Sequence, residues 1–254
     1  MTIYNITFSP TGGTRRVAEI LIKEFGTKPI DIELCVPENE LIIPEFSSED
    51  ICLISVPSFG GRVPQIAINR IELFNANGAK AVLVCVYGNR AYEDTLIELK
   101  DTAERVGFQC FAAISALSEH SIVREIAKGR PDSNDETVLK DFSKQIIGKI
   151  NNCDFKLNSP IPGNHTYKEH SKSKSVPETY ENCIGCKKCA SACPVSAIDF
   201  DNPQNTNAEK CVSCMKCVSV CPANARGLNK DVIMAISEKL GKICIERKQN
   251  ELFV

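Results

Sequence analysis

Eight cysteines lie between Cys183 and Cys221 in two groups of the same spacing. Each group reads C-x2-C-x2-C-x3-C-P, and corresponding residues such as Cys183 and Cys211 are 28 positions apart. We interpret the stretch as an internal duplication with two copies. Cysteine thiolates are soft ligands, so the pattern indicates a site for zinc or for iron–sulfur clusters.

The spacing separates these two alternatives. Three thiolates at i, i+3 and i+6 can bind three irons of one [4Fe–4S] cube, and the fourth iron needs a remote ligand. Zinc needs only two C-x2-C pairs, which leaves the third cysteine and the proline of each group unexplained. The pattern therefore favours iron–sulfur clusters.

The cysteine motif resembles that of the bacterial two-cluster ferredoxins. In that pattern the last cysteine of each group ligates the other cluster. The resemblance implies two [4Fe–4S] clusters, the first held by Cys183, Cys186, Cys189 and Cys221, and the second by Cys211, Cys214, Cys217 and Cys193. A module this small buries little apolar surface, so we expect ligation of the clusters to stabilise it.

A second group of residues with possible chemistry lies near the N-terminus. The stretch "FSPTGGTRRVAE" places small and hydroxyl residues where a strand turns into a helix, namely Ser9, Thr11, Gly12, Gly13 and Thr14. Backbone N–H groups, hydroxyls and a helix N-terminus can together bind a phosphate. The lysine of an ATP-binding loop and the G-x-G-x-x-G of dinucleotide sites are absent from the sequence. The alternative is an ordinary glycine turn capped by threonine.

The elements that position this loop alternate along residues 1–150. Apolar, β-branched runs predict strands over 2–8, 29–34, 51–56, 81–87 and 108–115. Amphipathic runs predict helices over 14–25, 64–74, 92–106 and 134–150. Five strands alternating with helices indicate a parallel sheet covered on both faces.

The S-x-T-G-x-T pattern after the first strand resembles the phosphate loop of flavodoxins. "VPSFGGRVP" and "YGNRAYEDTL" follow the third and fourth strands, where that family has its other flavin loops. The resemblance implies an α/β, flavodoxin-like, doubly wound five-stranded parallel sheet of order 2-1-3-4-5 that binds FMN. It implies ring stacking by Phe59 and Tyr92, and further contacts from Pro57, Ser58, Gly60, Gly61, Gly88 and Asn89.

Some residues depart from the family pattern or have simpler interpretations. The chain has no tryptophan, and Asn89 is followed by Arg90 where many flavodoxins carry an acid. If Arg62 and Arg90 face the flavin, their charge makes it a better electron acceptor; otherwise they are solvated loop residues. Phe59 and Tyr92 could instead pack structurally. His120 is interpreted as a surface residue.

The predicted organisation has four parts. Residues 1–150 form the FMN-binding domain, 151–176 a polar surface linker, 177–229 a small α+β dicluster domain, and 230–254 a C-terminal amphipathic helix with its clearest pattern over 230–248. Phe155, Leu157 and Ile161 could anchor the first half of the linker. Six single cysteines are interpreted as buried small hydrophobes, namely Cys35, Cys52, Cys85, Cys110, Cys153 and Cys244.

The composition bounds the class of protein. The chain has 254 residues, 43% of them hydrophobic, and a net charge of −2. This charge predicts neither nucleic acid nor a membrane surface as partner. An export signal and an apolar run of eighteen residues are both lacking, so we expect a cytoplasmic protein.

The whole chain resembles the flavodoxin–ferredoxin fusion proteins of anaerobic bacteria and archaea. The resemblance implies an electron-transfer protein that passes electrons between two [4Fe–4S] clusters and FMN, and exchanges them with partner oxidoreductases. Two alternatives stay open at this point. The chain could be an FMN-dependent reductase of a small acceptor fed through the clusters, or its first domain could be a flavin-free docking module.

Overall fold

A twisted, mostly parallel sheet forms the centre of the larger domain. The structure is a computed structural model that describes residues 1–170 and 175–254. In the described chain the strands of this sheet follow the order β2-β1-β3-β4-β5-β8. The parallel strands are β1 (Ile3–Thr7), β2 (Ile30–Glu33), β3 (Ile51–Pro57), β4 (Lys80–Tyr87) and β5 (Gln109–Leu117). The order 2-1-3-4-5 confirms the predicted flavodoxin-like fold class.

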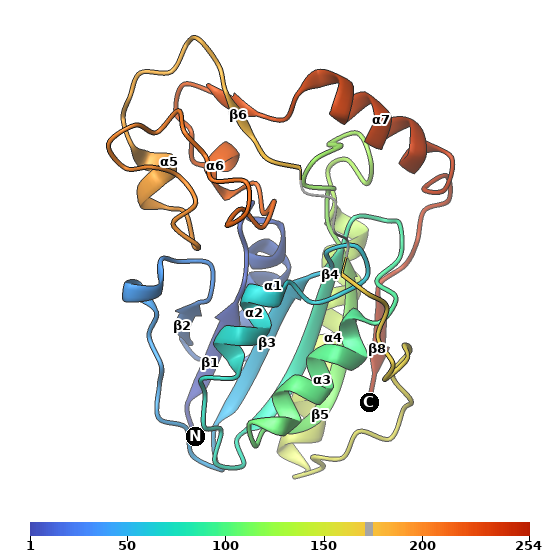
Figure 1. Cartoon of the computed structure of the whole chain (residues 1–254). Helices are drawn as coiled ribbons and strands as arrows, with labels where there is room; N and C mark the ends of the chain where they lie inside the picture. Colours follow the sequence, from blue (N-terminus) through green and yellow to red (C-terminus); the bar gives the residue numbers. More distant parts are fainter. Residues whose placement is uncertain (171–174) are drawn as a thin grey trace.

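Two helices cover each face of this sheet (Figure 1). Helices α1 (Gly13–Lys23) and α4 (Ser133–Asn151) pack on one face, and α2 (Gln65–Ile71) and α3 (Thr95–Arg105) on the other. Successive residues of a strand point to opposite faces. Accordingly, Leu53 packs in the core with α1 and α4, whereas Ile54 packs in the core with α2 and α3.

The cysteine-rich module lies at the carboxyl ends of the parallel strands (Figure 1). It contains β6 (Glu178–Thr179), α5 (Lys188–Ser191), α6 (Lys216–Ser219) and β7 (Arg226–Gly227). Strands β6 and β7 pair antiparallel, which joins the start of the first repeat to the end of the second. The 3₁₀ turn η1 (Glu38–Glu40) follows β2.

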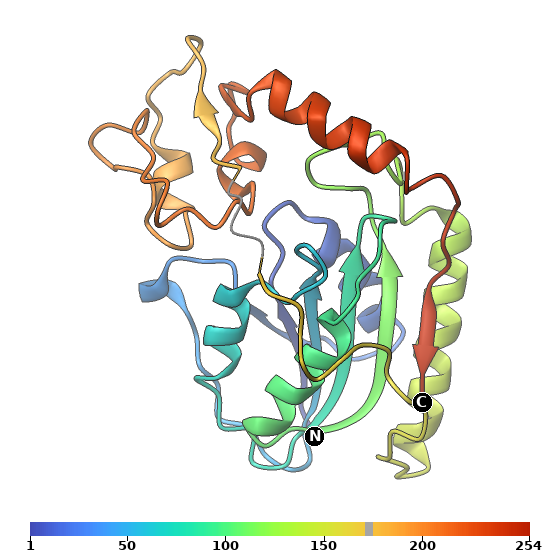
Figure 2. The ribbon, with the colours of Figure 1, turned by 45° about the vertical axis from the view of Figure 1, so that its right-hand side comes forward.

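The prediction of one helix to the C-terminus was wrong. Helix α7 (Lys230–Gly241) ends early, and Glu251–Phe253 form β8, which pairs antiparallel with β5. The edge of β5 offers unpaired backbone groups, and these residues satisfy them. Leu240 is the buried residue of α7, and Ile233 and Ile236 of the predicted apolar stripe are half-buried, so this helix is only partly packed. Figure 2 shows α7 crossing above the sheet from the cysteine module toward β8.

The segment after α4 lies against the larger domain. Phe155 packs edge-on against Phe111 at 5.3 Å, and Ile161 packs against the core beside α2 and α3. Residues 171–174 of the predicted linker lie outside the described residues.

The six single cysteines outside the repeat differ in their exposure to solvent. Four of them are buried as predicted, namely Cys35, Cys52, Cys85 and Cys110. Cys153 is exposed, which contradicts the prediction for that residue, and Cys244 is half-buried. Cys153 follows the end of α4 with φ 51°, so the chain turns away from the core there. No helix in the described part of the chain is long and apolar enough to cross a membrane.

Candidate functional site

The two cysteine groups have the same backbone conformation. Helices α5 and α6 each follow a residue in the left-handed region, Lys187 (φ 59°) and Met215 (φ 63°). Ser196 and Asn224, also 28 positions apart, share φ 49°. Left-handed φ is unusual for residues other than glycine, so its repetition shows that both groups impose the same turns. The duplication in sequence is therefore a duplication in structure.

Backbone N–H groups donate to cysteine sulfurs in both copies. The Ala197 N–H donates to Cys193 Sγ at 3.3 Å, and the Ala225 N–H donates to Cys221 Sγ at 3.2 Å. Donors of this kind stabilise a sulfur that carries negative charge, as cluster ligands do. Among the described residues, no three His, Cys, Asp or Glu side chains converge on a site for a single metal ion.

One sulfur of the second group contacts the larger domain directly. The Cys35 thiol, just after β2, donates a hydrogen bond to the Cys214 sulfur. This bond lowers the pKa of the Cys214 thiol to about 7, against the effect of burial. The same contact, with burial, raises the pKa of Cys35.

Two further contacts hold the module on the sheet. The Ser219 hydroxyl on α6 donates to the Pro10 carbonyl at 2.9 Å, in the loop after β1. The buried Arg70 on α2 donates to the Pro194 carbonyl at 2.8 Å. The second cysteine group therefore lies close to the first loop of the α/β domain.

That loop turns β1 into α1. Gly12, with φ 91°, is the N-cap residue of the helix and has no side chain to cap it. The Ser9 hydroxyl accepts the Arg15 N–H at 2.9 Å, so Ser9 helps to start the helix. Thr11, Gly13 and Thr14 line a narrow pocket of about 70 Å³ at this helix N-terminus.

The other walls of this pocket come from the ends of β3, β4 and β5. They are Pro57, Ser58, Phe59, Gly88, Ser118 and His120, together with neighbouring residues. Glycine is required at two places, because a Cβ on Gly13 would lie 2.5 Å from the Ser118 hydroxyl and one on Gly88 would lie 2.7 Å from the His120 ring. Phe59 is half-buried and lies outside the hydrophobic cores, so it is not a core residue.

A larger cavity of about 420 Å³ adjoins the narrow pocket, and the two share Ser58, Phe59, His120 and Ser121. Apolar side chains from the α/β domain line it, including Pro64, Ile66 and Ile122. Its remaining wall includes Cys211, Val212 and Ser213 of the second cysteine group. The cavity therefore extends from the sheet to the cysteine module.

Gly60 and Gly61 form the tip of a tight turn. Backbone hydrogen bonds join Phe59 and Arg62 in both directions, and the two glycines have φ 63° and 89°. Two consecutive positive φ values define a type I′ turn, which favours glycine. Gly61 also packs against Glu93, where a Cβ would lie 1.9 Å from the carboxylate. The turn accounts for both glycines.

Two sequence-predicted residues lie elsewhere. The Asn89 side chain donates to the Glu246 carbonyl at 2.8 Å and accepts the Lys248 N–H at 3.1 Å. The Tyr92 hydroxyl donates to the Glu251 carboxylate at 2.8 Å. The structure does not bring these side chains to the pocket, because both form hydrogen bonds with the C-terminal segment. Sequence reasoning missed this segment, which carries no local signal for pairing with a distant loop.

The two arginines near these loops are paired within the α/β domain. Arg62 is buried, and its Nε donates to Glu98 Oε2 at 2.8 Å while its guanidinium stacks on Tyr167 at 4.9 Å. Arg90 pairs with Glu93 at 2.7 Å. Both arginines therefore have acidic partners, and the hypothesis that their charge acts on the flavin stays a prediction.

His120 is a pocket residue that sequence reasoning undervalued. Its ring lines both cavities, and its Nδ1 accepts the Ile122 and Val123 N–H groups at 3.2 and 3.0 Å. Burial, and then the charge of Arg90, lower the pKa of His120. The sequence signal for this role was its position just after the fifth predicted strand, because the carboxyl ends of parallel strands meet at the same edge of a sheet.

Comparisons with known proteins agree with this division of the chain. Residues 182–230 match the 4Fe-4S dicluster domain family. A comparison with curated proteins gives no match.

Solved structures similar to the α/β domain include two flavodoxins and one oxidoreductase. A flavodoxin of Streptococcus pneumoniae TIGR4 is 17% identical over 58% of this chain and 97% of its own (TM-score 0.37). An FMN-bound flavodoxin of Fusobacterium nucleatum is 13% identical over 58% and 96% (TM-score 0.37). Rubredoxin oxygen:oxidoreductase of Desulfovibrio gigas is 14% identical over 59% and 35% (TM-score 0.40).

The chain thus combines a flavodoxin-like α/β domain with a 4Fe–4S dicluster domain. The sheet order defines the first part, and the family match with the duplicated backbone defines the second. This pairing of domains supports a role in electron transfer, with two [4Fe–4S] clusters as cofactors.

Proposed function

We propose that this protein transfers electrons between partner oxidoreductases, two [4Fe–4S] clusters and a bound FMN. The observation that carries the proposal is the cavity shared by Phe59 and His120 of the α/β domain and Cys211–Ser213 of the second cysteine group. FMN supplies one- and two-electron chemistry, whereas each cluster exchanges single electrons. Cys183, Cys186, Cys189 and Cys221 hold the first cluster, and Cys211, Cys214, Cys217 and Cys193 the second.

The pocket residues fit FMN in their chemistry. Thr11, Gly13 and Thr14 offer hydroxyls and N–H groups at the helix N-terminus, where Gly12 provides no side-chain cap, which suits a phosphate. The adjoining 420 Å³ cavity has both apolar walls, including Pro64 and Ile66, and polar side chains, which suits a flavin ring with its polar edge, and Phe59 is the available aromatic side chain. In this arrangement the ring side of the site lies against the second cysteine group.

The test places a larger side chain in the cavity by replacing a residue of the cysteine module. Val212 lines the cavity, and its counterpart in the first repeat, Ile184, is 69% exposed. Val212→Trp should weaken FMN binding at least tenfold, because indole occupies the space for the ring, while Ile184→Trp should leave the affinity unchanged. Flavin fluorescence titration of anaerobically purified protein measures this, with iron and sulfide counted in each variant.

Two results would contradict the proposal. Wild-type protein that holds both clusters and never binds FMN would leave the α/β domain as a docking module. Unchanged FMN affinity in Val212→Trp would place the flavin away from the cavity. Turnover of a small acceptor with no protein donor would instead favour a reductase.

A further inference from the structure

Arg226 is a buried cation inside the dicluster module. It lies on β7 and is 4% exposed. Its Nη1 donates to the Pro203 carbonyl at 2.6 Å and to Cys189 Sγ at 3.7 Å. Its Nη2 donates to Thr206 Oγ1 at 2.5 Å and to the Pro177 carbonyl at 3.4 Å. Burial raises the pKa of the nearby Cys217 thiol, and the positive charge of Arg226 acts in the opposite direction.

The charge of Arg226 has no carboxylate partner. No ion pair of Arg226 occurs within residues 1–170 and 175–254, and its buried Nε has no hydrogen-bond partner. Its neutral oxygen partners orient the guanidinium without neutralising it. A buried, unpaired cation is strongly unfavourable, so a nearby negative charge is expected. The sulfurs of Cys189 and Cys217 are the anionic groups within reach once they are cluster ligands.

The duplication shows that the fold does not require this charge. The residue 28 positions before Arg226 is Ile198, which is buried with 6% exposure. Both copies make the same N–H to sulfur bond one residue earlier, from Ala197 and Ala225. An apolar side chain therefore fits this position of the repeat.

We propose that Arg226 is a positioning residue that serves as the shared counter-cation of the two clusters and raises both reduction potentials. The inference rests on the cluster ligands assigned above, since Cys189 belongs to the first set and Cys217 to the second. Reduction adds one electron to a cluster and makes or breaks no bond. The fixed guanidinium stabilises that added negative charge, and its hydrogen bond to Cys189 Sγ acts in the same direction.

The test replaces Arg226 by isoleucine, the residue at the corresponding position of the first repeat. In an anaerobic redox titration with dithionite and mediators, followed by EPR, Arg226→Ile should make both clusters harder to reduce. We expect each reduction equilibrium constant to fall about tenfold, equal to about 59 mV for one electron. Arg226→Lys keeps the charge and should retain most of the wild-type potentials. Lys210→Ile removes an exposed cation beside Cys211 and is the control.

The outcomes separate this inference from the proposed function. Iron and sulfide counts that show no clusters in wild-type protein would overturn the cluster assignment. Unchanged potentials in a fully loaded Arg226→Ile would overturn the counter-cation inference alone. If that variant does not retain both clusters, Arg226→Gln gives the same comparison with a neutral hydrogen-bonding side chain. Equal potentials in Arg226→Gln and Arg226→Lys would then refute the inference.

Discussion

At the scale of single residues, His120 couples the loop after β5 to the candidate flavin pocket. Its neutral Nδ1 accepts two backbone N–H groups, from Ile122 and Val123. Protonation would replace this acceptor with a donor and break both bonds. Because burial and Arg90 lower the folded-state pKa, the neutral form is favoured in the native loop.

The depressed pKa of His120 gives a prediction for pH. The stabilisation is fully present above the unfolded value near 6.5 and is lost as the pH falls through the lower, folded-state pKa. FMN affinity of the wild type should therefore fall below about pH 6.5 more steeply than that of His120→Asn, whose amide oxygen accepts at all pH values. Fluorescence titrations between pH 5 and 8, set up at roughly half-unit steps around the histidine pKa, measure the difference.

The control for this prediction is His165→Asn. His165 pairs with Asp101 on the surface, away from both cavities, so its replacement should follow the wild-type curve. Titration of the FMN phosphate is common to all three proteins and cancels in the comparison. Identical pH curves for wild type and His120→Asn would show that His120 does not support the pocket.

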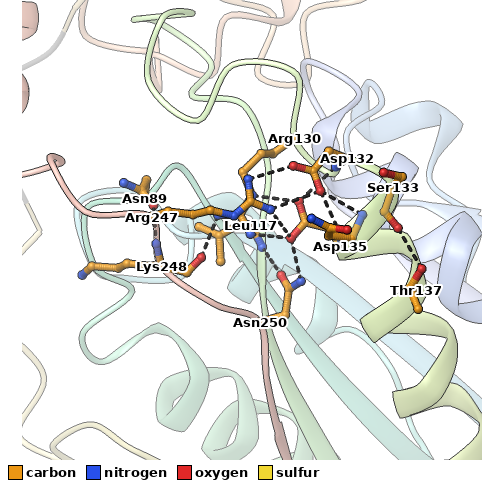
Figure 3. Close-up of polar contacts among 11 residues, drawn as sticks. Asn89, Leu117, Arg130, Asp132, Ser133, Asp135, Thr137, Arg247, Lys248 and Asn250 are labelled. Carbon is orange, nitrogen blue, oxygen red and sulfur yellow. Dashed lines mark hydrogen bonds and ion pairs between the residues drawn. The ribbon is translucent and has the colours of Figure 1, made fainter.

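At the scale of elements, the C-terminal segment fastens the cysteine module to the α/β domain. Figure 3 shows Arg247 and Asn250 beside the start of α4, with Asn250 also meeting Leu117 of β5 and Lys248 meeting Asn89. Arg130 pairs with Asp135 inside this network, and Arg247 reaches Asp132 at 2.7 Å. Hydrogen bonds from Arg247 hold the pKa of Asp132 below its usual range. The segment thereby ties α7 to β5 through β8.

Asn250 is the central residue of this contact. Its oxygen accepts the Leu117 N–H at 2.9 Å, and its amide donates to Asp135 at 3.0 Å. Asn250→Ala leaves the buried Leu117 N–H without its acceptor, while Asp135 keeps its pairing with Arg130, so the change should cost about 1–3 kcal/mol of local stability. Hydrogen exchange of β8 amides should accelerate accordingly, while Gln249→Ala, an exposed neighbour, should not change it. Equal protection in both variants would mean that β8 is held by backbone pairing alone.

The same segment shows why sequence reasoning succeeded for some elements and failed for others. The strands and helices of residues 1–150 carry their periodicity locally, and the dicluster domain carries its signal in the cysteine spacing, so the fold class and this domain could be predicted. The assignment of single cysteines to each cluster stays a prediction. Strand β8 has three residues and forms only because the edge of β5 is open. Asn89 and Tyr92 were assigned to flavin because their partners, residues 246–251, lie more than 150 positions away.

At the scale of the molecule, the two cysteine groups face different surroundings. In the second group, Cys211 and Cys214 are buried, beside the cavity and Cys35 respectively. In the first group, the counterpart of Cys214 is Cys186, which is exposed beside the exposed Ile184. Each group has two buried cysteines, and the difference appears in the proposed ligand sets: the first set includes the exposed Cys186, whereas Cys193, Cys211 and Cys214 of the second set are buried. Short distances favour electron transfer, so we expect that a partner protein would exchange electrons at the first cluster of the proposed arrangement.

This difference gives the last prediction, which concerns the route of electrons. Cys186→Ser should impair the first cluster, and reduction of bound FMN by a protein donor should then slow at least tenfold, because the second group is shielded by the α/β domain. Stopped-flow absorbance with a dithionite-reduced two-cluster ferredoxin as the donor measures the rate. Dithionite itself is small enough to bypass the first cluster, so its rate should change less. Cys153→Ser, which alters an exposed cysteine outside both groups, should react like the wild type. If the protein donor reduces FMN equally fast in Cys186→Ser, electrons enter elsewhere and the exposed cysteine group is not the docking site.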